Sequence, residues 1–330
     1  MILIFSSEAD SSTCDVIDWL NFYNADFLRI NFDDLVVDND IKIEINNLSS
    51  DVLLRYREKT VDLKSISCFW YRRGGYFKFT ESINWNKTET SKEVKNALSF
   101  DLWNEAKRIT DFIHFTIKDK PSINSFFTST PNKLIMLKTA VECGIKIPPT
   151  IITKNKSELD TFSRKNGNVI TKGIDESIHF GDNQSFYSVY TEEITDIDKF
   201  PNRFFPSKVQ QKIDKQFELR VFYFFGKFFS MAIFSQKNKK TSVDFRKYDE
   251  KKPNRCVPYE LPKYMEDKLD ELMKKMNLNC GSIDLIYSKR NEYIFLEINP
   301  VGQFGMVSTP CNYNIEKLIA EKLIEFEKNN

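Results

Sequence analysis

Gly281-Ser282-Ile283-Asp284-Leu285-Ile286 and the later run Ile294-Phe295-Leu296-Glu297-Ile298-Asn299-Pro300 place polar side chains within otherwise apolar, strand-like segments. Alternation along a strand puts Glu297 and Asn299 on one face, with their Cα atoms roughly 7 Å apart. Asp284 supplies a third oxygen if the two runs pair. Carboxylate and amide oxygens suit Mg²⁺, which keeps further positions for water and phosphate oxygens. The runs therefore predict a magnesium nucleotide site, and the alternative is a hairpin whose polar residues face water.

The composition is typical of a soluble globular protein. The 330 residues are enough for two or three structural units with a large buried core. The 48 basic and 47 acidic residues nearly cancel, which gives no global field for nucleic acid or an anionic membrane. The stretch 1–7 is too short for a signal peptide, and no apolar run reaches a membrane-spanning length. We therefore expect a cytoplasmic protein that binds neither nucleic acid nor membrane.

The cysteines and histidines argue against a zinc site and against a nucleophilic triad. The six cysteines form no CxxC pair, and no histidine stands at zinc-ligand spacing, so we expect reduced, buried thiols. His114 and His179 are the only histidines, and both are interpreted as structural residues.

Residues 1–125 have the pattern of an α/β unit that begins with a strand, a helix and a second strand. The sequence Arg72-Arg73-Gly74-Gly75 follows a further apolar strand, where it is either a lip for an anionic group or a solvated basic turn. The predicted elements are strands at 2–5, 27–30 and 68–71 and helices at 16–20 and 94–113.

Residues 126–205 predict a second, small α/β unit. Asn132 or Thr130 is the expected cap of a helix that ends at Cys143, with Gly144 just beyond it and two prolines after that. The other predicted elements are strands at 150–153 and 169–172 and a helix at 157–165.

Residues 206–330 predict an antiparallel sheet that carries the metal-binding runs, followed by a final amphipathic helix. The predicted elements are strands beginning at 208, at 219–225 and at 228–234, and helices at 262–276 and 314–327.

Three basic residues are candidates for binding phosphate. Lys133 lies in the first turn of a predicted helix and Lys172 closes an apolar strand, so each can direct an ammonium group into a cleft; the alternative for each is a solvated charge. Arg220 stands in an apolar strand and needs an anionic partner. That partner is either a phosphoryl or acyl phosphate group, or Glu218 in a structural ion pair.

Asp244 and Arg246 repeat the two-residue spacing of Glu218 and Arg220 after a basic loop. They are candidates for substrate binding and catalysis.

Taken together and in this order, these residues resemble the ATP-grasp superfamily, and within it the graspetide maturases, which are microviridin-type peptide ligases and include the grasp-with-spasm maturases. The likeness covers nearly the whole chain. The segments that carry it are Asn132-Lys133, Gly144 to Thr150, Thr171-Lys172-Gly173, Val209-Gln210-Gln211-Lys212-Ile213, Glu218-Leu219-Arg220, Asp284, Glu297 to Phe304 and Trp70-Tyr71-Arg72-Arg73.

The resemblance implies an α/β and α+β fold with an N-terminal pre-ATP-grasp domain (1–125), a central subdomain (126–205) and a C-terminal subdomain with the metal site (206–330). It also implies ATP and Mg²⁺ as cofactors and a homodimer. The segment 173–183 matches the loop that covers the phosphates. The implied ATP-binding residues are Lys133, Ile170, Lys172, Gln211, Lys212, Ile213, Glu218 and Ile286, and the implied metal ligands are Asp284, Glu297 and Asn299. Arg220 matches the arginine that steadies the acyl phosphate, and with Lys172 it is an implied catalytic residue; Asp244 and Arg246 join them as catalytic candidates from their spacing.

The implied reaction is phosphorylation of an Asp or Glu side chain of a ribosomal precursor peptide, followed by attack of a Ser or Thr hydroxyl or a Lys amine from the same peptide. The product is an ω-ester or ω-amide cross-link, and a leader segment of the precursor is the expected partner. Two alternatives stay open. One is a ligase that adds a free amino acid to a peptide or protein, and the other is a nucleotide-binding scaffold without turnover.

Overall fold

The structure is a computed structural model, and two compact units account for the chain. The first unit comprises residues 1–130, 303–305 and 314–330, and the second comprises residues 131–302 and 306–313. The described residues are 1–32, 40–56, 59–77, 91–175, 179–181, 186–188, 191–235 and 254–329.

A parallel sheet forms the centre of the first unit, as the sequence predicts for a βαβ pattern. Its order is β2-β1-β6-β7, and neighbouring strands are parallel. Both faces are covered, so the strands are almost continuously apolar and buried. The strands are β1 (Ile2–Ser6), β2 (Phe27–Asn31), β6 (Cys68–Tyr71) and β7 (Ser122–Ile123).

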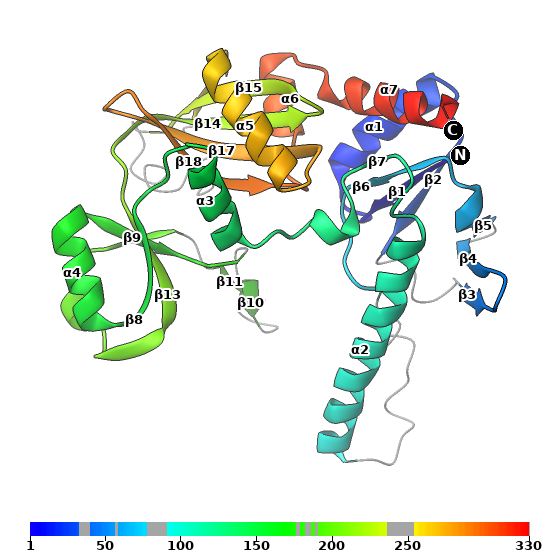
Figure 1. Ribbon diagram of the computed structural model, residues 1–330, viewed down its shortest axis with the longest axis horizontal. Helices are drawn as coiled ribbons and strands as arrows, with labels where there is room; N and C mark the ends of the chain where they lie inside the picture. Colours follow the sequence, from blue (N-terminus) through cyan, green and yellow to red (C-terminus); the bar gives the residue numbers. More distant parts are fainter. Residues whose placement is uncertain are drawn as a thin grey trace. The chain divides into compact units, whose positions relative to one another are not determined.

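Three helices accompany this sheet: α1 (Ser11–Phe22), α2 (Lys92–Thr116) and α7 (Ile315–Lys328). The C-terminal α7 lies beside α1 and also contacts β1, β6 and β7 (Figure 1). Its buried residues Ile315, Ile319, Ala320 and Leu323 have the three- and four-residue spacing of one helix face. The contacts therefore group α7 with the N-terminal residues, whereas the sequence analysis placed it in the segment 206–330. The reason is that its apolar stripe fits the helix and sheet of the first unit.

An antiparallel sheet of β3 (Asp40–Ile45), β4 (Ser50–Tyr56) and β5 (Lys59–Asp62) completes the first unit, with short 3-10 turns at Leu63–Ser65 and Phe126–Thr128.

A buried ion pair stands at the carboxyl end of β6. Arg72 is 3% exposed, and its Nε lies 3.1 Å from Oδ2 of Asp10, which also accepts a hydrogen bond of 2.9 Å from the Thr13 hydroxyl. Nε of Arg73 lies 3.5 Å from the same oxygen, and this side chain is partly exposed. The solvated-turn interpretation is therefore wrong for Arg72, because its charge is buried and paired.

The interpretation of His114 as a structural residue is confirmed by its packing in the first unit. The imidazole is 4% exposed and stacks on Phe126 at 4.4 Å between ring centroids, with the edges of Phe5 and Tyr71 at 4.8 and 5.4 Å. Burial lowers the pKa of His114 to about 3, because the charged form loses its hydration.

The second unit contains two antiparallel sheets. The central one has the order β12-β9-β13-β8, and α4 covers one of its faces through Leu159 packed on Val169 and Val209. The elements are β8 (Thr150–Asn155), α4 (Lys156–Asn166), β9 (Val169–Lys172), β12 (Glu192–Ile194) and β13 (Arg203–Gln211), with a separate hairpin of β10 (His179–Gly181) and β11 (Phe186–Ser188) and a 3-10 turn at Ile197–Lys199.

The larger sheet has the order β16-β15-β14-β17-β18 and carries the two runs predicted to bind metal. Strands β17 and β18 pair as a hairpin, so the predicted proximity of Asp284 and Glu297 is confirmed. The elements are α3 (Lys133–Glu142), β14 (Lys215–Phe224), β15 (Lys227–Phe234), β16 (Arg255–Tyr259), α5 (Lys263–Lys275), β17 (Cys280–Ser288), β18 (Tyr293–Asn299) and the short α6 (Gly305–Cys311).

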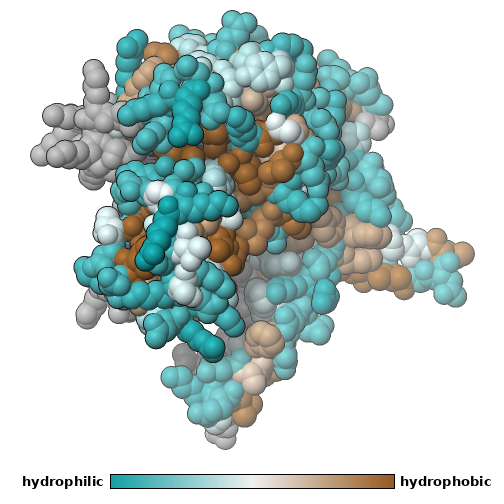
Figure 2. All heavy atoms as spheres, turned by 60° about the vertical axis from the view of Figure 1, so that its left-hand side comes forward, coloured by the Kyte–Doolittle hydropathy of each residue, from teal (hydrophilic) through white to brown (hydrophobic). Residues whose placement is uncertain are grey.

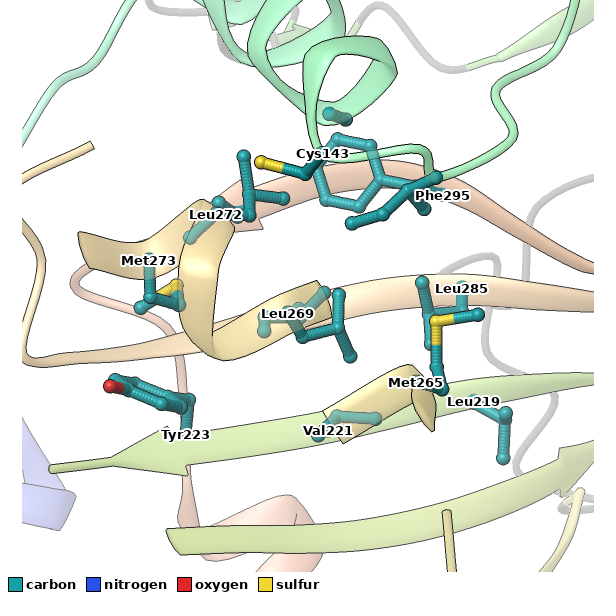
Figure 3. Packing of buried hydrophobic residues seen from close by; sticks show 14 of the residues in the cluster. Cys143, Leu219, Val221, Tyr223, Met265, Leu269, Leu272, Met273, Leu285 and Phe295 are labelled. Atoms are coloured by element: carbon teal, nitrogen blue, oxygen red, sulfur yellow. The ribbon is translucent and has the colours of Figure 1, made fainter. Parts of the chain in front are cut away.

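Helices α3 and α5 cover one face of this sheet. Figure 3 shows Leu269 and Leu272 of α5 packed over Leu219 and Val221 of β14 and over Leu285 of β17. These side chains are at most 1% exposed. Since side chains alternate across a strand, the residues between them face the opposite side of the sheet. The buried core therefore fixes which side chains face the site.

Candidate active site

A narrow cavity lies between the two sheets of the second unit, and eight of the predicted site residues line it. Its volume is ≈ 80 Å³, well below the roughly 300–1,000 Å³ of typical small-molecule sites. A nucleotide would therefore need the walls of the cavity to move apart. The eight residues are Ile170, Lys172, Gln211, Ile213, Glu218, Asp284, Ile286 and Glu297.

Two lysines from different elements meet at Glu297. Lys133 is the first residue of α3 and Lys172 the last residue of β9, and their Nζ atoms lie 3.4 and 3.5 Å from the same oxygen, Oε2. Asn132 caps α3, as predicted, by accepting hydrogen bonds of 2.9 and 3.3 Å from the amides two and three residues later. The cap fixes the turn from which Lys133 projects. Two ammonium groups at one carboxylate give the positive excess that phosphate binding requires.

Arg220 pairs with Asp284 and not with Glu218. The two residues are opposite each other on β14 and β17, and Nη1 donates to both carboxylate oxygens at 2.7 Å. Their side chains are 9% and 13% exposed. The alternative of an Arg220–Glu218 ion pair is wrong, because the cross-strand register brings Asp284 closer.

Glu218, which lies on the same face of β14 as Arg220, belongs to a separate buried pair. It accepts from the ammonium of Lys215 and, at 3.1 Å, from the hydroxyl of Ser235. Burial raises the pKa of Glu218, and the bonds from Lys215 and Ser235 partly oppose this shift. Glu218 lines the cavity that the resemblance assigns to ATP.

Asn299 has the environment of a metal ligand. Its Oδ1 is buried, and no hydrogen-bond partner for it occurs within the described part of the chain. Buried carbonyl oxygens rarely go unpaired, so this atom calls for a partner outside the described residues, and a metal ion would be one. Glu297, two residues before Asn299, is paired with Asp284 across the hairpin. The side-chain oxygens of these three residues fit Mg²⁺, which takes few protein ligands. Among the described residues, no group of three or more His, Cys, Asp or Glu side chains is arranged to hold a metal ion.

A bulge in β18 shapes the metal-binding side. The register shifts between the pairs Asp284–Glu297 and Leu285–Phe295, which leaves Leu296 without a direct partner. As a result Phe295 stays in the core, while both Leu296 and Glu297 line the cavity. Strict alternation predicts the shared face of Glu297 and Asn299 but not this local change.

The linker between β13 and β14 offers backbone groups to a ligand. The amides of Gln211 and Lys212 already donate to the carbonyls of Pro149 and Asn168, at 2.9 and 2.8 Å, and the Lys212 ammonium bonds to Glu193. Within the described residues no hydrogen bond involves the Lys212 carbonyl or the Ile213 amide. These two groups are therefore the ones that can bind an adenine edge.

The sequence analysis missed Lys208. This side chain is 2% exposed on β13, and it lies opposite Lys172 in the central sheet. Burial lowers the pKa of Lys208 to about 7, and the charges of Lys172 and Lys133 add to this shift while Glu297 opposes it. No local signal marks the residue, because its neighbours depend on the register between distant strands.

Two of the predicted catalytic residues, Asp244 and Arg246, lie outside the described residues, as does part of the predicted phosphate-covering loop at 173–183.

A larger cavity of ≈ 520 Å³ lies next to the same linker but does not include Lys172 or Glu297. Its apolar lining comes from Ile145, Ile147 and Ile294, among others. On the face shown in Figure 2, hydrophobic side chains collect in a hollow between hydrophilic areas.

Comparisons with known proteins agree with this architecture. Residues 1–111 match the family model of the MvdD pre-ATP grasp domain. A RiPP-associated ATP-grasp ligase from Chryseobacterium gregarium, solved with ADP and a leader and core peptide, is 26% identical with a TM-score of 0.82, and the match covers 98% of this chain and 96% of that one. The macrocyclase MdnC from Microcystis aeruginosa MRC, bound with the precursor peptide MdnA, is 25% identical with a TM-score of 0.80 and coverages of 98% and 99%.

The ATP-grasp ligase PsnB, at 15% identity and a TM-score of 0.74 over 99% of this chain and 98% of that one, shares the fold. The search of curated proteins gave no match. No helix within the described ranges has the length and apolar character to cross a membrane. The predicted fold class and the resemblance to the ATP-grasp graspetide maturases are confirmed.

Proposed function

From its likeness to the ATP-grasp graspetide maturases, we propose that this chain is an ATP-dependent peptide ligase that closes macrocycles in a ribosomally made precursor peptide. The observation that carries the proposal is the convergence of Lys133 and Lys172 on Glu297, beside Asn299, whose buried oxygen has no partner among the described residues. The complexes of the relatives with ADP and with precursor peptides support the same class of substrate.

The chemistry begins with attack of a peptide Asp or Glu carboxylate on the terminal phosphorus of ATP, which forms an acyl phosphate and releases ADP. A hydroxyl or amine of the same peptide then attacks the acyl carbon, loses its proton, and expels inorganic phosphate. The net result is an ester or amide bond, ADP and phosphate. Both kinds of product agree with the residues of the site.

In this scheme Lys133 and Lys172 hold the phosphates, and Arg220 stabilises charge on the acyl phosphate. Asp284, Glu297 and Asn299 would hold Mg²⁺, which would neutralise charge on the phosphate oxygens. The residues act by positioning and by charge, so the enzyme needs no nucleophile of its own.

In the structure Glu297 pairs with both lysines, and Asp284 pairs with Arg220. Binding of Mg²⁺ would therefore require Glu297 to release the lysines and Asp284 to serve the metal as well as Arg220. Phosphate groups supply the exchange partner for the lysines, so nucleotide and metal are expected to bind together.

The test is mass spectrometry of a candidate precursor incubated with the enzyme, ATP and Mg²⁺. We expect the peptide to lose one water per cross-link, and Glu297→Gln to abolish that loss. Glu292→Gln is the matched control, because Glu292 lies on the same hairpin but pairs with Lys146 outside the metal-binding side.

Other outcomes have defined meanings. A gain of one amino-acid mass identifies a ligase that adds a free amino acid. A precursor that stays unchanged while ATP remains intact contradicts the proposal and favours a scaffold without turnover. A homodimer and contacts with the leader segment of the precursor remain predictions, which light scattering and peptide titration can check.

A further inference from the structure

Lys208 lies on the face of the central sheet that looks into the nucleotide cavity. The register pairs Lys208 with Lys172 and Gln210 with Ile170, so these four side chains share one face. Ile170, Lys172 and Gln210 line the cavity, whereas Val169 and Val209 point the other way, into the core against α4. The alternation therefore directs the Lys208 ammonium towards the cavity side.

Lys208 is more deeply buried than Lys133 and Lys172, the two lysines predicted from the sequence. Lys208 is 2% exposed, compared with 18% and 16% for the side chains of Lys133 and Lys172. A buried ammonium group costs free energy unless an anion compensates it. Lys208 also lies on β13, an inner strand of its sheet. An inner strand holds a side chain in a fixed position, as a ligand-binding site requires.

The charges around Lys208 do not compensate it. Those that act on it come from Lys172, Glu297, Lys133 and the exposed Asp175. Among the described residues, the ammonium groups of Lys133, Lys172 and Lys208 therefore gather around the carboxylate of Glu297. The other two carboxylates of the cavity, Glu218 and Asp284, are paired with Lys215 and Arg220. A polyanion with several oxygens along a chain is the ligand that such an array accommodates.

We infer that Lys208 is a third cationic residue for the triphosphate chain of ATP, beside Lys172 and Lys133. The inference rests on the proposed function, which places a nucleotide in this cavity. Lys208 stabilises the phosphate groups beyond the first one, because it lies beside Lys172 at the end of β9 and not beside Ile170 on the adenine side.

The test is the affinity of purified Lys208→Met for AMP, ADP and AMP-PNP in the presence of Mg²⁺, measured by calorimetry. Loss of one hydrogen bond to a charged group corresponds to about a 10- to 100-fold change in affinity. We expect that loss for AMP-PNP, a smaller one for ADP, and little change for AMP. Lys154→Met is the matched control, because Lys154 is exposed on β8 of the same sheet.

The melting temperature of the ligand-free protein separates this role from a structural one. A ligand-binding lysine is buried at a cost, so Lys208→Met should melt no lower than the wild type. Lys208→Arg keeps the charge and is expected to recover part of the AMP-PNP affinity.

Equal losses for AMP and AMP-PNP, or no loss for either, would overturn the inference while leaving the proposed function intact. A lower melting temperature with unchanged AMP-PNP affinity would identify Lys208 as a structural residue. A wild-type protein that binds none of the three nucleotides would instead overturn the proposed function itself.

Discussion

Gly302 is the position where a single methyl group should disturb the metal site without touching any ligand side chain. The residue follows the turn that begins at Asn299, and its amide donates to the Asn299 carbonyl at 3.1 Å. A Cβ added at Gly302 would lie 2.5 Å from Oγ and 2.6 Å from Cβ of Ser282, and 3.0 Å from the Asn299 carbonyl oxygen. The substitution Gly302→Ala therefore pushes the turn away from β17.

The size of the effect follows from these distances. Ordinary contact begins near 3.4 Å, so the two Cβ atoms must separate by 0.8 Å. Ser282 is wholly buried on β17 and cannot move into solvent. Overpacking of this kind costs about 1–3 kcal/mol of unfolding free energy. Because the Asn299 backbone moves with the turn, we also expect Mg²⁺-dependent ADP affinity to fall by about 10- to 100-fold.

The assay combines urea unfolding with ADP titration at several Mg²⁺ concentrations. Gly75→Ala is the matched control, because no atom of the described residues lies within 4 Å of a Cβ at Gly75. The double variant Gly302→Ala with Ser282→Gly removes both clashing atoms of Ser282 and should recover most of the loss. The double variant Gly302→Ala with Ser282→Ala removes only Oγ and leaves Cβ, so it should recover less of the stability and affinity.

The reasoning would be refuted if Gly302→Ala matched Gly75→Ala in both stability and Mg²⁺-dependent affinity. It would also be wrong if Ser282→Gly gave no coupling with Gly302→Ala in the double-mutant cycle, since the argument depends on contact between these two residues.

Three further predictions concern stability. Arg220→Met removes the Arg220 cation from the partly buried Asp284 and should cost up to about 3–5 kcal/mol. Arg164→Met, at an exposed pair with Asp160, should cost no more than about 1 kcal/mol, and equal urea midpoints for the two variants would contradict this. The pKa of His114 is about 3 in the folded protein against 6.5 ordinarily, so the unfolded chain binds more protons between these values and stability falls with decreasing pH by up to about 1.4 kcal/mol per unit. Urea unfolding at pH 7.5 and 5 should show this loss reduced in His114→Phe, and the same pH dependence in both proteins would exclude His114 as its cause. Asn132→Ala removes the cap of α3 and should cost about 0.5–2 kcal/mol of unfolding free energy. Thermal unfolding checks this against Asn155→Ala, at a helix start without a side-chain capping bond. An unchanged melting temperature of Asn132→Ala would argue against the cap.

Local chemistry made much of the fold predictable from the sequence. Asn132 and Gly144 delimit α3 because a side-chain cap and a residue with φ +66° act within a few positions of themselves. The apolar runs predict strands because a strand buried on both faces needs apolar side chains throughout. The proposed magnesium ligands stand out in the sequence for the same reason, since Asp284, Glu297 and Asn299 interrupt such runs.

The partners of the charged residues were not predictable in this way. Arg220 has Glu218 two residues away on its own strand, yet it pairs with Asp284, which is 64 positions distant. Arg72 appeared in the sequence as part of a basic turn, yet it is buried against Asp10. Both partners come from the pairing or packing of remote elements, which local sequence does not specify.

The sequence by itself determined the kinds of element and the residue types of the site, because helix caps, alternation and glycine turns act over a few residues. Tertiary structure alone decided that Lys208 stands opposite Lys172, that a bulge turns both Leu296 and Glu297 into the cavity, and that α7 packs on α1. The physical reason is that register, bulges and docking depend on the core as a whole. In the larger sheet, α3 and α5 bury one face and thereby set which side chains meet on the other.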